Sequence, residues 1–224
     1  MTAIAAAVGL SGGAALYGLW PEESHLLRAC AGALMFAAVS VPAGWWLGWK
    51  YDRLARLSVM DPLTGAYNRR FVETGFVKLT ARASKQRKRM AIILLDVNDF
   101  KQVNDSLGHA KGDAAIREVA LALRHCAECG EIVARWGGDE FMVICPYADD
   151  KAVATLLRSV RERLEYASLR TGIRLAVSAG VAAYPADGAQ ISQLAQIADT
   201  RMYADKLLAK RDQAEQESAQ AMAQ

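Results

Sequence analysis

The distribution of apolar and charged positions divides the chain into two parts. Residues 2–20 and 29–49 contain no charged side chain, whereas charged residues recur throughout the rest of the sequence. A helix needs ~20 apolar residues to cross the hydrocarbon core of a bilayer, and each run is long enough. The pattern therefore predicts a transmembrane helical hairpin over residues 1–49, with a polar turn at residues 21–25.

Tryptophans and charges at the ends of these runs support this interpretation and orient it. Trp20 ends the first run and Trp49 the second, as expected of interfacial aromatic residues. Basic residues follow the second run while acidic residues lie in the turn, so the positive-inside rule places the following domain in the cytoplasm. Two alternatives are a secretory signal peptide, which would need a basic segment before the first run, and a buried helical pair of a soluble protein.

Beyond residue 50 the periodicity becomes that of a soluble domain. Residues 50–60 continue the second helix as a connector; Pro62 and Gly65 then end it and start a domain expected to cover residues 61–211. Helices are expected at residues 68–87, 99–108, 113–127, 150–169 and 191–210, and strands at residues 90–95, 132–134, 141–144 and 174–183. The polar residues 212–224 are expected to form a frayed or disordered tail.

A central hairpin carries the candidate chemistry. Apolar residues precede and follow Arg135–Phe141, so Gly137 and Gly138 form a turn between two strands, with two acidic residues, Asp139 and Glu140, at its tip. Together with the alternation of strands and helices, this hairpin predicts an α/β (α+β) sandwich around a central sheet that contains antiparallel strands. A charged turn exposed to solvent is the ordinary alternative.

A third carboxylate, Asp96, ends an apolar strand-like run. If that strand pairs beside the hairpin, Asp96, Asp139 and Glu140 converge at one end of the sheet. Clustered oxygen ligands without His or Cys favour Mg²⁺ or Mn²⁺ over zinc. Two such ions can activate an attacking oxygen and neutralise a phosphate that is being transferred. Lys101 and Lys206 are then candidate phosphate ligands, although Lys206 alone would be taken for a solvated helix position.

Composition argues against several other functions. The formal net charge of the 224 residues is only +3, and no basic stripe is interleaved with aromatic residues, so no nucleic-acid partner is expected. The four cysteines do not form a disulfide framework in a chain of this length. Cys126 and Cys129 have the spacing of a zinc-ligand pair, but a single pair without further ligands is a weak metal or redox signal.

Several motifs follow one another along the soluble domain. They are Asp61–Gly65 with Asn68–Arg70, Leu95–Lys101, Asn104–His109, Gly112–Asp113, Arg135–Phe141, and Ala198–Asp199 with Tyr203 and Lys206. In order and spacing they resemble the GGDEF domain of diguanylate cyclases, from Asp61 to about Lys210. A lone Gly-Gly-Asp-Glu-Phe would be a weak match, whereas motifs spread over the whole domain are a specific one.

The resemblance implies a nucleotidyl-cyclase sheet related to polymerase palms, and a reaction that joins two GTP molecules into cyclic di-GMP with release of two pyrophosphates. It implies two Mg²⁺ (or Mn²⁺) ions per active site. It also implies a homodimer, because each domain holds one GTP and the two nucleotides must meet. With the membrane hairpin, this would be a multi-pass protein of the bacterial cytoplasmic (inner) membrane.

The resemblance also assigns roles to matching positions. The implied metal ligands are Asp96, Asp139 and the main-chain carbonyl of Val97; the implied catalytic residues are Asp139, Glu140 and Lys206. The implied substrate-binding residues are Phe100, Lys101, Asn104, His109, Asp113, Gly137, Gly138 and Lys210. Asn104 and Asp113 would read guanine, because a carboxylate accepts from its N1–H and 2-amino group while adenine offers no matching pair of donors.

Several positions depart from the family pattern. Asn98 replaces the usual second acid after the first metal ligand. Lys210 stands where a phosphate-binding Arg is expected, which keeps the charge but loses the bidentate fork. Many members carry Arg-x-x-Asp before the hairpin and bind product there, whereas this chain has Glu128 and Glu131. Since an acid repels a phosphate, we expect product inhibition through this site to be lost.

Two other functions compete with a cyclase. One is a catalytically silent receptor for GTP or cyclic di-GMP, and the other is a membrane scaffold that only transmits contacts. The intact Asp96, Asp139, Glu140 and Lys206 favour the cyclase. Because the turn between the two apolar runs is short, an input signal is expected to arrive through the membrane helices or through an unknown partner.

Overall fold

The computed structural model describes residues 25–57, 59–147 and 149–222. The chain divides into two units, Met1–Ser58 and Val59–Gln224. In the first unit, α2 (His25–Leu57) is one continuous helix. Its segment Cys30–Lys50 has a mean hydropathy of 1.5 and is long and apolar enough to cross a membrane. Residues 2–20 lie outside the described residues, so the predicted hairpin of two membrane helices stays a prediction.

The large apolar side chains between Leu34 and Trp49 of α2 are exposed. Leu34, Phe36 and Trp45 are among them, and Lys50 lies with its Nζ 4.6 Å from the ring centroid of Trp46. A long apolar helix segment in which no residue is buried is compatible with a lipid environment. A single helix of this kind is weak evidence for a membrane anchor by itself, because a signal sequence has the same length and composition.

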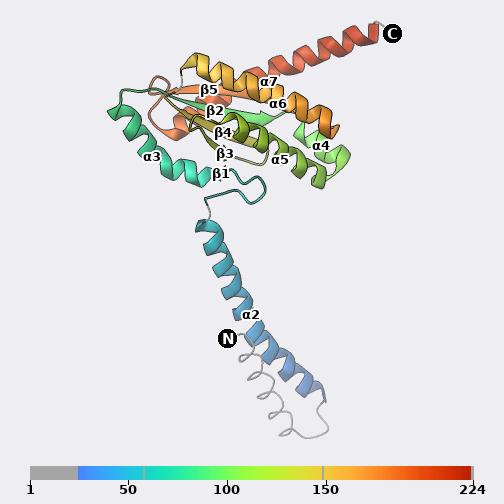
Figure 1. Cartoon of the computed structure of the whole chain (residues 1–224). Coiled ribbons are helices and arrows are strands. Elements are labelled where there is room, and N and C mark those ends of the chain that lie inside the picture. Colours follow the sequence, from blue (N-terminus) through green and yellow to red (C-terminus); the bar gives the residue numbers. More distant parts are fainter. Residues whose placement is uncertain (1–24, 58, 148, 223–224) are drawn as a thin grey trace. The chain divides into compact units, whose positions relative to one another are not determined.

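The second unit is built on a five-stranded sheet in the order β1–β3–β4–β2–β5 (Figure 1). The strands are β1 (Tyr67–Asn68), β2 (Met90–Val97), β3 (Ile132–Arg135), β4 (Glu140–Pro146) and β5 (Val177–Tyr184). β1 runs parallel to β3, and all the other neighbouring strands are antiparallel. The mixed α/β fold with an antiparallel hairpin is therefore confirmed.

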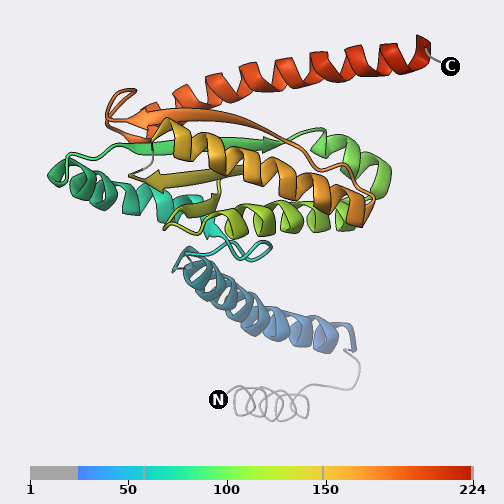
Figure 2. The same ribbon diagram turned by 45° about the horizontal axis from the view of Figure 1, so that its top comes forward.

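Helices cover both faces of this sheet (Figure 2). They are α3 (Arg69–Lys85), α4 (Phe100–Leu107), α5 (His109–Cys126), α6 (Asp150–Thr171) and α7 (Ile191–Met222). α5 and α6 pack on one face, and α3 and α7 on the other. β2 lies between β4 and β5 and is buried along its whole length, which explains why its sequence is a continuous apolar run rather than an alternating one.

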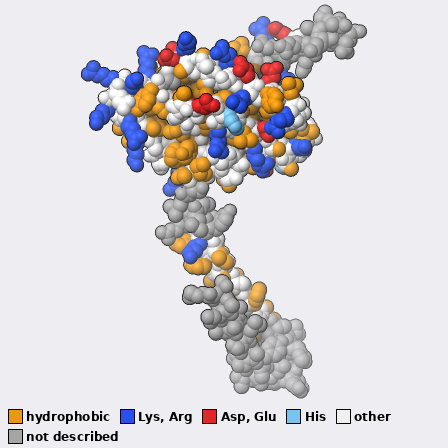
Figure 3. Space-filling model, viewed as in Figure 1, with side chains coloured by type: hydrophobic (Ala, Val, Ile, Leu, Met, Phe, Trp, Pro, Cys, Tyr) orange, Lys and Arg blue, Asp and Glu red, His pale blue; other side chains and the backbone are white. Residues whose placement is uncertain are grey.

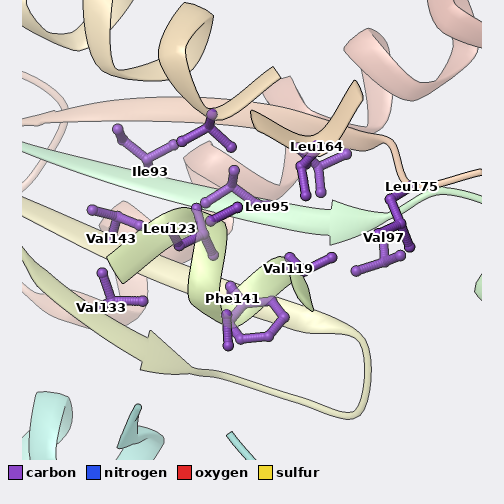
Figure 4. Packing of buried hydrophobic residues seen from close by; sticks show 14 of the residues in the cluster. Ile93, Leu95, Val97, Val119, Leu123, Val133, Phe141, Val143, Leu164 and Leu175 are labelled. Atoms are coloured by element: carbon purple, nitrogen blue, oxygen red, sulfur yellow. The ribbon is translucent and has the colours of Figure 1, made fainter. Parts of the chain in front are cut away.

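The larger core cluster lies between the sheet and helices α5 and α6 (Figure 4). Alternate residues of β2, namely Ile93, Leu95 and Val97, point into it. The intervening residues Ile92 and Leu94 belong to the second cluster, on the α3 and α7 face. Because side chains alternate along a strand, Asp96 is assigned to the α3 and α7 face as well. The alternation therefore places the carboxylate of Asp96, and with it the candidate site, on the α3 and α7 face of the sheet.

Three differences from the expected elements bear on the site or on the chain end, beside smaller shifts of element bounds. β1 was not expected, since a two-residue strand is too short to give a periodic signal. α5 begins at His109 rather than at residue 113, because Gly108 (φ 81°) ends α4 and lets the next helix start at once. The expectation of a disordered tail was wrong: α7 continues to Met222, through a segment rich in Ala, Glu and Gln, which are strong helix formers.

α7 packs directly on the backbone of β5 at Gly180. A Cβ atom at this position would lie 1.9 Å from the carbonyl oxygen of Ala198 and 2.3 Å from the amide nitrogen of Met202. Only glycine permits this approach, and the side chain of Asp205 accepts a hydrogen bond from the amide of Ala179 at 2.9 Å. α7 is thereby fixed across the sheet, and it carries Lys206 to the end of β2.

Candidate active site

Two carboxylates lie side by side at one end of the sheet. Asp96, near the end of β2, is the register partner of Glu140, the first residue of β4. Asp96 is only 9 % exposed. Both residues lie in the alternation that points to the α3 and α7 face, with Leu94 and Met142 as their neighbours in that cluster. The predicted convergence of the acids is confirmed for this pair.

Lys206 reaches the same point from α7. Its Nζ donates a hydrogen bond to Oδ1 of Asp96, and the two side chains form an ion pair that is mostly shielded from solvent. A carboxylate buried as deeply as Asp96 needs a counter-charge or a hydrogen-bond donor. Lys206 supplies both, so it is not a solvated helix position. It contacts a predicted metal ligand directly.

The hairpin turn is held by its own backbone. The amides of Trp136 and Gly137 both donate to the carbonyl oxygen of Glu140, at 2.8 and 3.2 Å. The carbonyl oxygen of Asp139 accepts from the amide of Val97 at 3.1 Å. This last bond joins the turn to the end of β2, so Asp139 and Val97, two predicted metal ligands, are neighbours.

Arg135 holds the turn through a second set of bonds. Its Nε and one terminal nitrogen donate to the carbonyl oxygen of Gly138 at 3.1 and 2.6 Å, and its other terminal nitrogen lies 3.3 Å from both carboxylate oxygens of Asp61. Asp61 also accepts from the amide and hydroxyl of Thr64 at 2.9 and 2.7 Å. The sequence indicated Asp61 only as the start of the domain, whereas the structure shows that it supports the turn.

The charges around Asp61 lower its pKa. Burial by itself would raise the pKa of Asp61, but the hydrogen bonds from Thr64 and the positive charge of Arg135 outweigh burial and hold the pKa below its ordinary value. The carboxylate is therefore ionised at neutral pH and remains a strong partner for Arg135. A sequence signal for the bond to Thr64 existed, since an Asp before Pro-Leu-Thr-Gly can accept from the amide three residues later.

Glu140 lies in an acidic environment. Burial raises the pKa of Glu140 above its ordinary value, and the neighbouring negative charges raise it further. These neighbours are Asp139, Asp96 and Asp199. A Cβ at Gly137 would lie 2.5 Å from Oε2 of Glu140, so the missing side chain there leaves room for this carboxylate. Asp199 belongs to one of the sequence motifs, but the motif alone assigned no role to it.

A pocket of about 400 Å³ opens beside Glu140. Its wall includes Trp136 and Arg69, whose guanidinium carbon lies 4.5 Å from the centroid of the indole ring. Arg69 also pairs with Glu73 at 2.8 Å on the surface of α3. The stacked Arg69 and Trp136 pack the start of α3 against the residue before the Gly-Gly turn, which gives the turn a further support.

The side chains at this end of the sheet carry oxygen atoms of the kind that divalent cations prefer. Within the described residues, no three His, Cys, Asp or Glu side chains are gathered closely enough to hold a metal ion. The donor types nevertheless suit one, because Asp96, Asp139 and Glu140 offer hard oxygen atoms. Burial, and after it the negative charges of Asp139, Asp96 and Asp199, raises the pKa of Glu140, and a cation would offset these charges. In this structure Lys206 supplies the positive charge at Asp96.

The predicted guanine readers lie on two adjacent helices. Asn104 is on α4, and its side chain lies against the backbone of Gly112 on α5, next to the ring of Phe100. Asp113 follows Gly112 and is exposed. Two further predicted residues, Lys101 near the start of α4 and His109 at the start of α5, are exposed as well.

Asn98 and Lys210, two positions that depart from the family pattern, lie away from the Asp96–Lys206 pair. Asn98 accepts a hydrogen bond from the buried hydroxyl of Ser178 at 2.8 Å, so its side chain is occupied in joining β2 to β5. Lys210 lines a pocket of about 590 Å³ together with Asn98 and Arg174. The structure does not bring Lys210 to Asp96 as it brings Lys206.

The segment before the hairpin, Glu128–Glu131, has no basic side chain that could bind a phosphate. Glu128 and Glu131 occupy it, and Oε2 of Glu131 accepts from the amide of Cys129 at 2.8 Å. Cys126 and Cys129 are free thiols. On the face of the second unit shown in Figure 3, Lys and Arg side chains gather at one end and are otherwise interspersed with acidic ones.

Comparison with known proteins places this site in a family. Residues 58–212 match the family described as "Diguanylate cyclase, GGDEF domain". The diguanylate cyclase DosC of Escherichia coli K12 is 32% identical over 161 residues, which cover 70% of this chain and 35% of DosC. The bifunctional diguanylate cyclase/cyclic di-GMP phosphodiesterase MucR of Pseudomonas aeruginosa is 33% identical over 152 residues, which cover 67% of this chain and 22% of MucR. The chain thus spans about a third or less of these relatives.

A solved structure gives the same result for the fold. The GGDEF domain of DgcB from Caulobacter crescentus, crystallised in complex with c-di-GMP, superposes with a TM-score of 0.61 at 29% sequence identity. The matched region covers 67% of this chain and 89% of that domain. The likeness therefore extends over nearly all of the known domain.

Proposed function

Because the chain belongs to the GGDEF family of diguanylate cyclases, we propose that it condenses two GTP molecules into cyclic di-GMP and two pyrophosphates. The observation that carries this proposal is the pairing of Asp96 with Glu140 beside the Gly-Gly turn, with Lys206 bound to Asp96 from α7. A domain retained only as a scaffold would not need acidic residues and a lysine to be held together at one sheet end.

The proposed reaction consists of two equivalent displacements. In each, the ribose 3′-oxygen of one GTP attacks the α-phosphorus of the other, the 3′-proton leaves, and pyrophosphate departs. Asp96, Asp139 and the Val97 carbonyl would hold two divalent cations, Mg²⁺ or Mn²⁺, which lower the pKa of the attacking hydroxyl and neutralise the phosphates. Glu140 would stabilise the metal site or accept the 3′-proton.

The remaining residues would bind and orient the nucleotide. Lys206 would exchange its bond to Asp96 for the terminal phosphates once cations occupy the site, and Lys101 and Phe100 would contact the triphosphate. Asn104 and Asp113 would bind guanine across the junction of α4 and α5, supported by His109. The bare backbone at Gly138 leaves room for the nucleotide, since nothing lies within 4 Å of where its Cβ would be.

The reaction requires a homodimer. Each domain would hold one GTP, and the 3′-hydroxyl of one nucleotide must face the α-phosphate of the other. Anchoring in the bacterial inner membrane would raise the local concentration of the domains and restrict their orientation. The exposed apolar segment Cys30–Lys50 supports such an anchor. A multi-pass topology, with residues 2–20 as the other span, belongs to the same proposal.

Turnover of GTP tests the proposal directly. Detergent-solubilised full-length protein is incubated with GTP and Mg²⁺, and cyclic di-GMP is measured beside the Asp139→Ala variant. We expect product from the native chain and none from the variant. A well-folded dimeric native protein that makes no product would refute the cyclase, and GTP binding without turnover would then identify a silent receptor.

Product inhibition is proposed to be absent at the segment before the hairpin. Glu128 and Glu131 carry negative charge where a phosphate of cyclic di-GMP would need a cation. Adding cyclic di-GMP during turnover is expected to leave the initial rate unchanged, whereas the double variant Glu128→Arg, Glu131→Asp is expected to become inhibited. Strong inhibition of the native chain that disappears on Glu128→Ala would contradict this.

A further inference from the structure

Gly112, near the start of α5, determines how closely the side chain of Asn104 on α4 can approach α5. Gly112 is buried and lies within the regular helix α5. A Cβ atom at Gly112 would lie 1.9 Å from Oδ1 and 2.9 Å from Cγ of Asn104, and 3.3 Å from Cε2 of Phe100. Real side chains do not approach a Cβ that closely, so the carboxamide of Asn104 occupies the space that any other residue at 112 would fill.

Two other glycines show that this is not ordinary helix packing. At Gly75, in the middle of α3, a Cβ atom would have no neighbour within 4 Å, so that site is open. At Gly180 the Cβ would meet main-chain atoms of Ala198 and Met202, so that glycine is required by the packing of α7 on β5. At Gly112 the nearest atoms belong to the end of a side chain, which can move without the backbone.

We propose that Gly112 is a positioning residue for guanine recognition. This inference rests on the proposed function, in which Asn104 and Asp113 bind the base. The two readers come from different helices, and Gly112 lies between them: it precedes Asp113 in α5 and supports Asn104 of α4. The absent Cβ lets the Asn104 carboxamide lie directly on α5, at the residue that precedes Asp113, and in the proposed function both side chains bind one planar base.

The substitution Gly112→Ala separates this role from a structural one. Alanine suits the helical backbone at this position and is a better helix former than glycine, so the melting temperature is expected to stay the same or to rise. The added methyl displaces the Asn104 carboxamide from its place on α5. We expect the KM for GTP to rise about tenfold or more, and the preference for GTP over ATP in competition binding to fall by a similar factor.

Gly75→Ala is the matched control. It is also a Gly-to-Ala change inside a helix, but its Cβ meets nothing, so its kinetics and GTP preference are expected to equal those of the native chain. Asn104→Ala supplies the second control. If Gly112 acts through Asn104, the double variant Asn104→Ala, Gly112→Ala should be little worse than Asn104→Ala alone.

Three outcomes would overturn the inference. Gly112→Ala could leave the KM and the preference for GTP unchanged, it could unfold the domain, or its effect could add in full to that of Asn104→Ala. A native chain that binds no GTP would instead refute the proposed function itself. Because all variants are compared with native full-length protein for binding, turnover and melting temperature, the two failures are distinguishable.

Discussion

The two halves of the candidate site are built in different ways. The acidic half is fixed by sheet register: Asp96 faces Glu140 across β2 and β4, and Lys206 pairs with Asp96. The base-reading half is fixed by the contact of two helices, with Asn104 seated on Gly112 and Asp113 exposed beside it. Charge is concentrated and partly buried in the first half, whereas the second is formed by steric fit at the surface.

Because of this difference, we expect the two halves to respond to different changes in sequence and conditions. Buried charges respond to the loss of a partner, to cations and to pH, because their energies depend on neighbouring charges in a poorly screened environment. A surface formed by steric fit responds to single methyl groups and to the identity of the base. The acidic half should therefore control the rate of the chemical step, and the helical half the affinity and the choice of nucleotide.

The largest expected effect is a division between kcat and KM. Asp139→Ala removes a proposed metal ligand, and a ligand that acts in the transition state supports kcat, so kcat is expected to fall by about 1000-fold or more while GTP remains bound. Asp113→Ala removes a proposed ground-state contact with guanine, so the KM for GTP should rise about 10- to 100-fold with a smaller change in kcat. Equal losses of kcat in both variants would show that the halves do not have separate roles.

The next effect tests the ion pair. Lys206→Met leaves the carboxylate of Asp96 buried without its partner, which should lower the free energy of unfolding by about 1–3 kcal/mol in urea titrations with a chelator present. Mg²⁺ should restore part of this loss, since a cation can replace the lysine. Lys78→Met, at an exposed position of α3, is the control. If Lys206→Met and the native protein have the same free energy of unfolding in the presence of chelator, the ion pair does not contribute to stability.

A smaller effect concerns pH. The pKa of Glu140 is raised by burial and by its acidic neighbours, so the folded protein binds this proton more tightly than the unfolded chain does. The stability linked to Glu140 is thus fully present below the unfolded-state pKa and is lost as pH rises through the raised folded-state pKa. Without metal, Glu140→Gln should melt at a higher temperature than native protein at neutral pH, and the difference should disappear in acid.

The pKa of Asp61 is shifted in the opposite direction to that of Glu140, so Asp61 serves as the control. Its pKa is lowered despite burial, through Thr64 and Arg135. Its contribution to stability is present above the unfolded-state pKa and is lost as pH falls through the lowered folded-state pKa. Asp61→Asn should therefore melt at a lower temperature than native protein at neutral pH and approach it in strong acid. Parallel pH trends for the two variants would contradict the assigned causes.

The acidic half could be predicted from the sequence better than the helical half. A continuous apolar run ending in Asp96 and a hairpin with Glu140 at its tip predict that the acids meet at one sheet end if the two pair side by side, and the structure shows this pairing. The space at Gly112 could not be predicted, since it depends on the distance between two helices. The pairing of Lys206 with Asp96 was also missed, because a lone lysine on a helix has no periodic signal.

The bond between Arg135 and Asp61 has a consequence for the order in which the chain folds. It joins positions 74 residues apart, and a contact between such distant positions is expected to form later than local contacts, because loop-closure entropy must be overcome first. The turn that bears Asp139 depends on Arg135 for its anchorage at Gly138. We therefore expect a nascent or partly folded chain to hold this turn by its local bonds alone, without the support of Asp61, and competence for GTP condensation to arise late in folding.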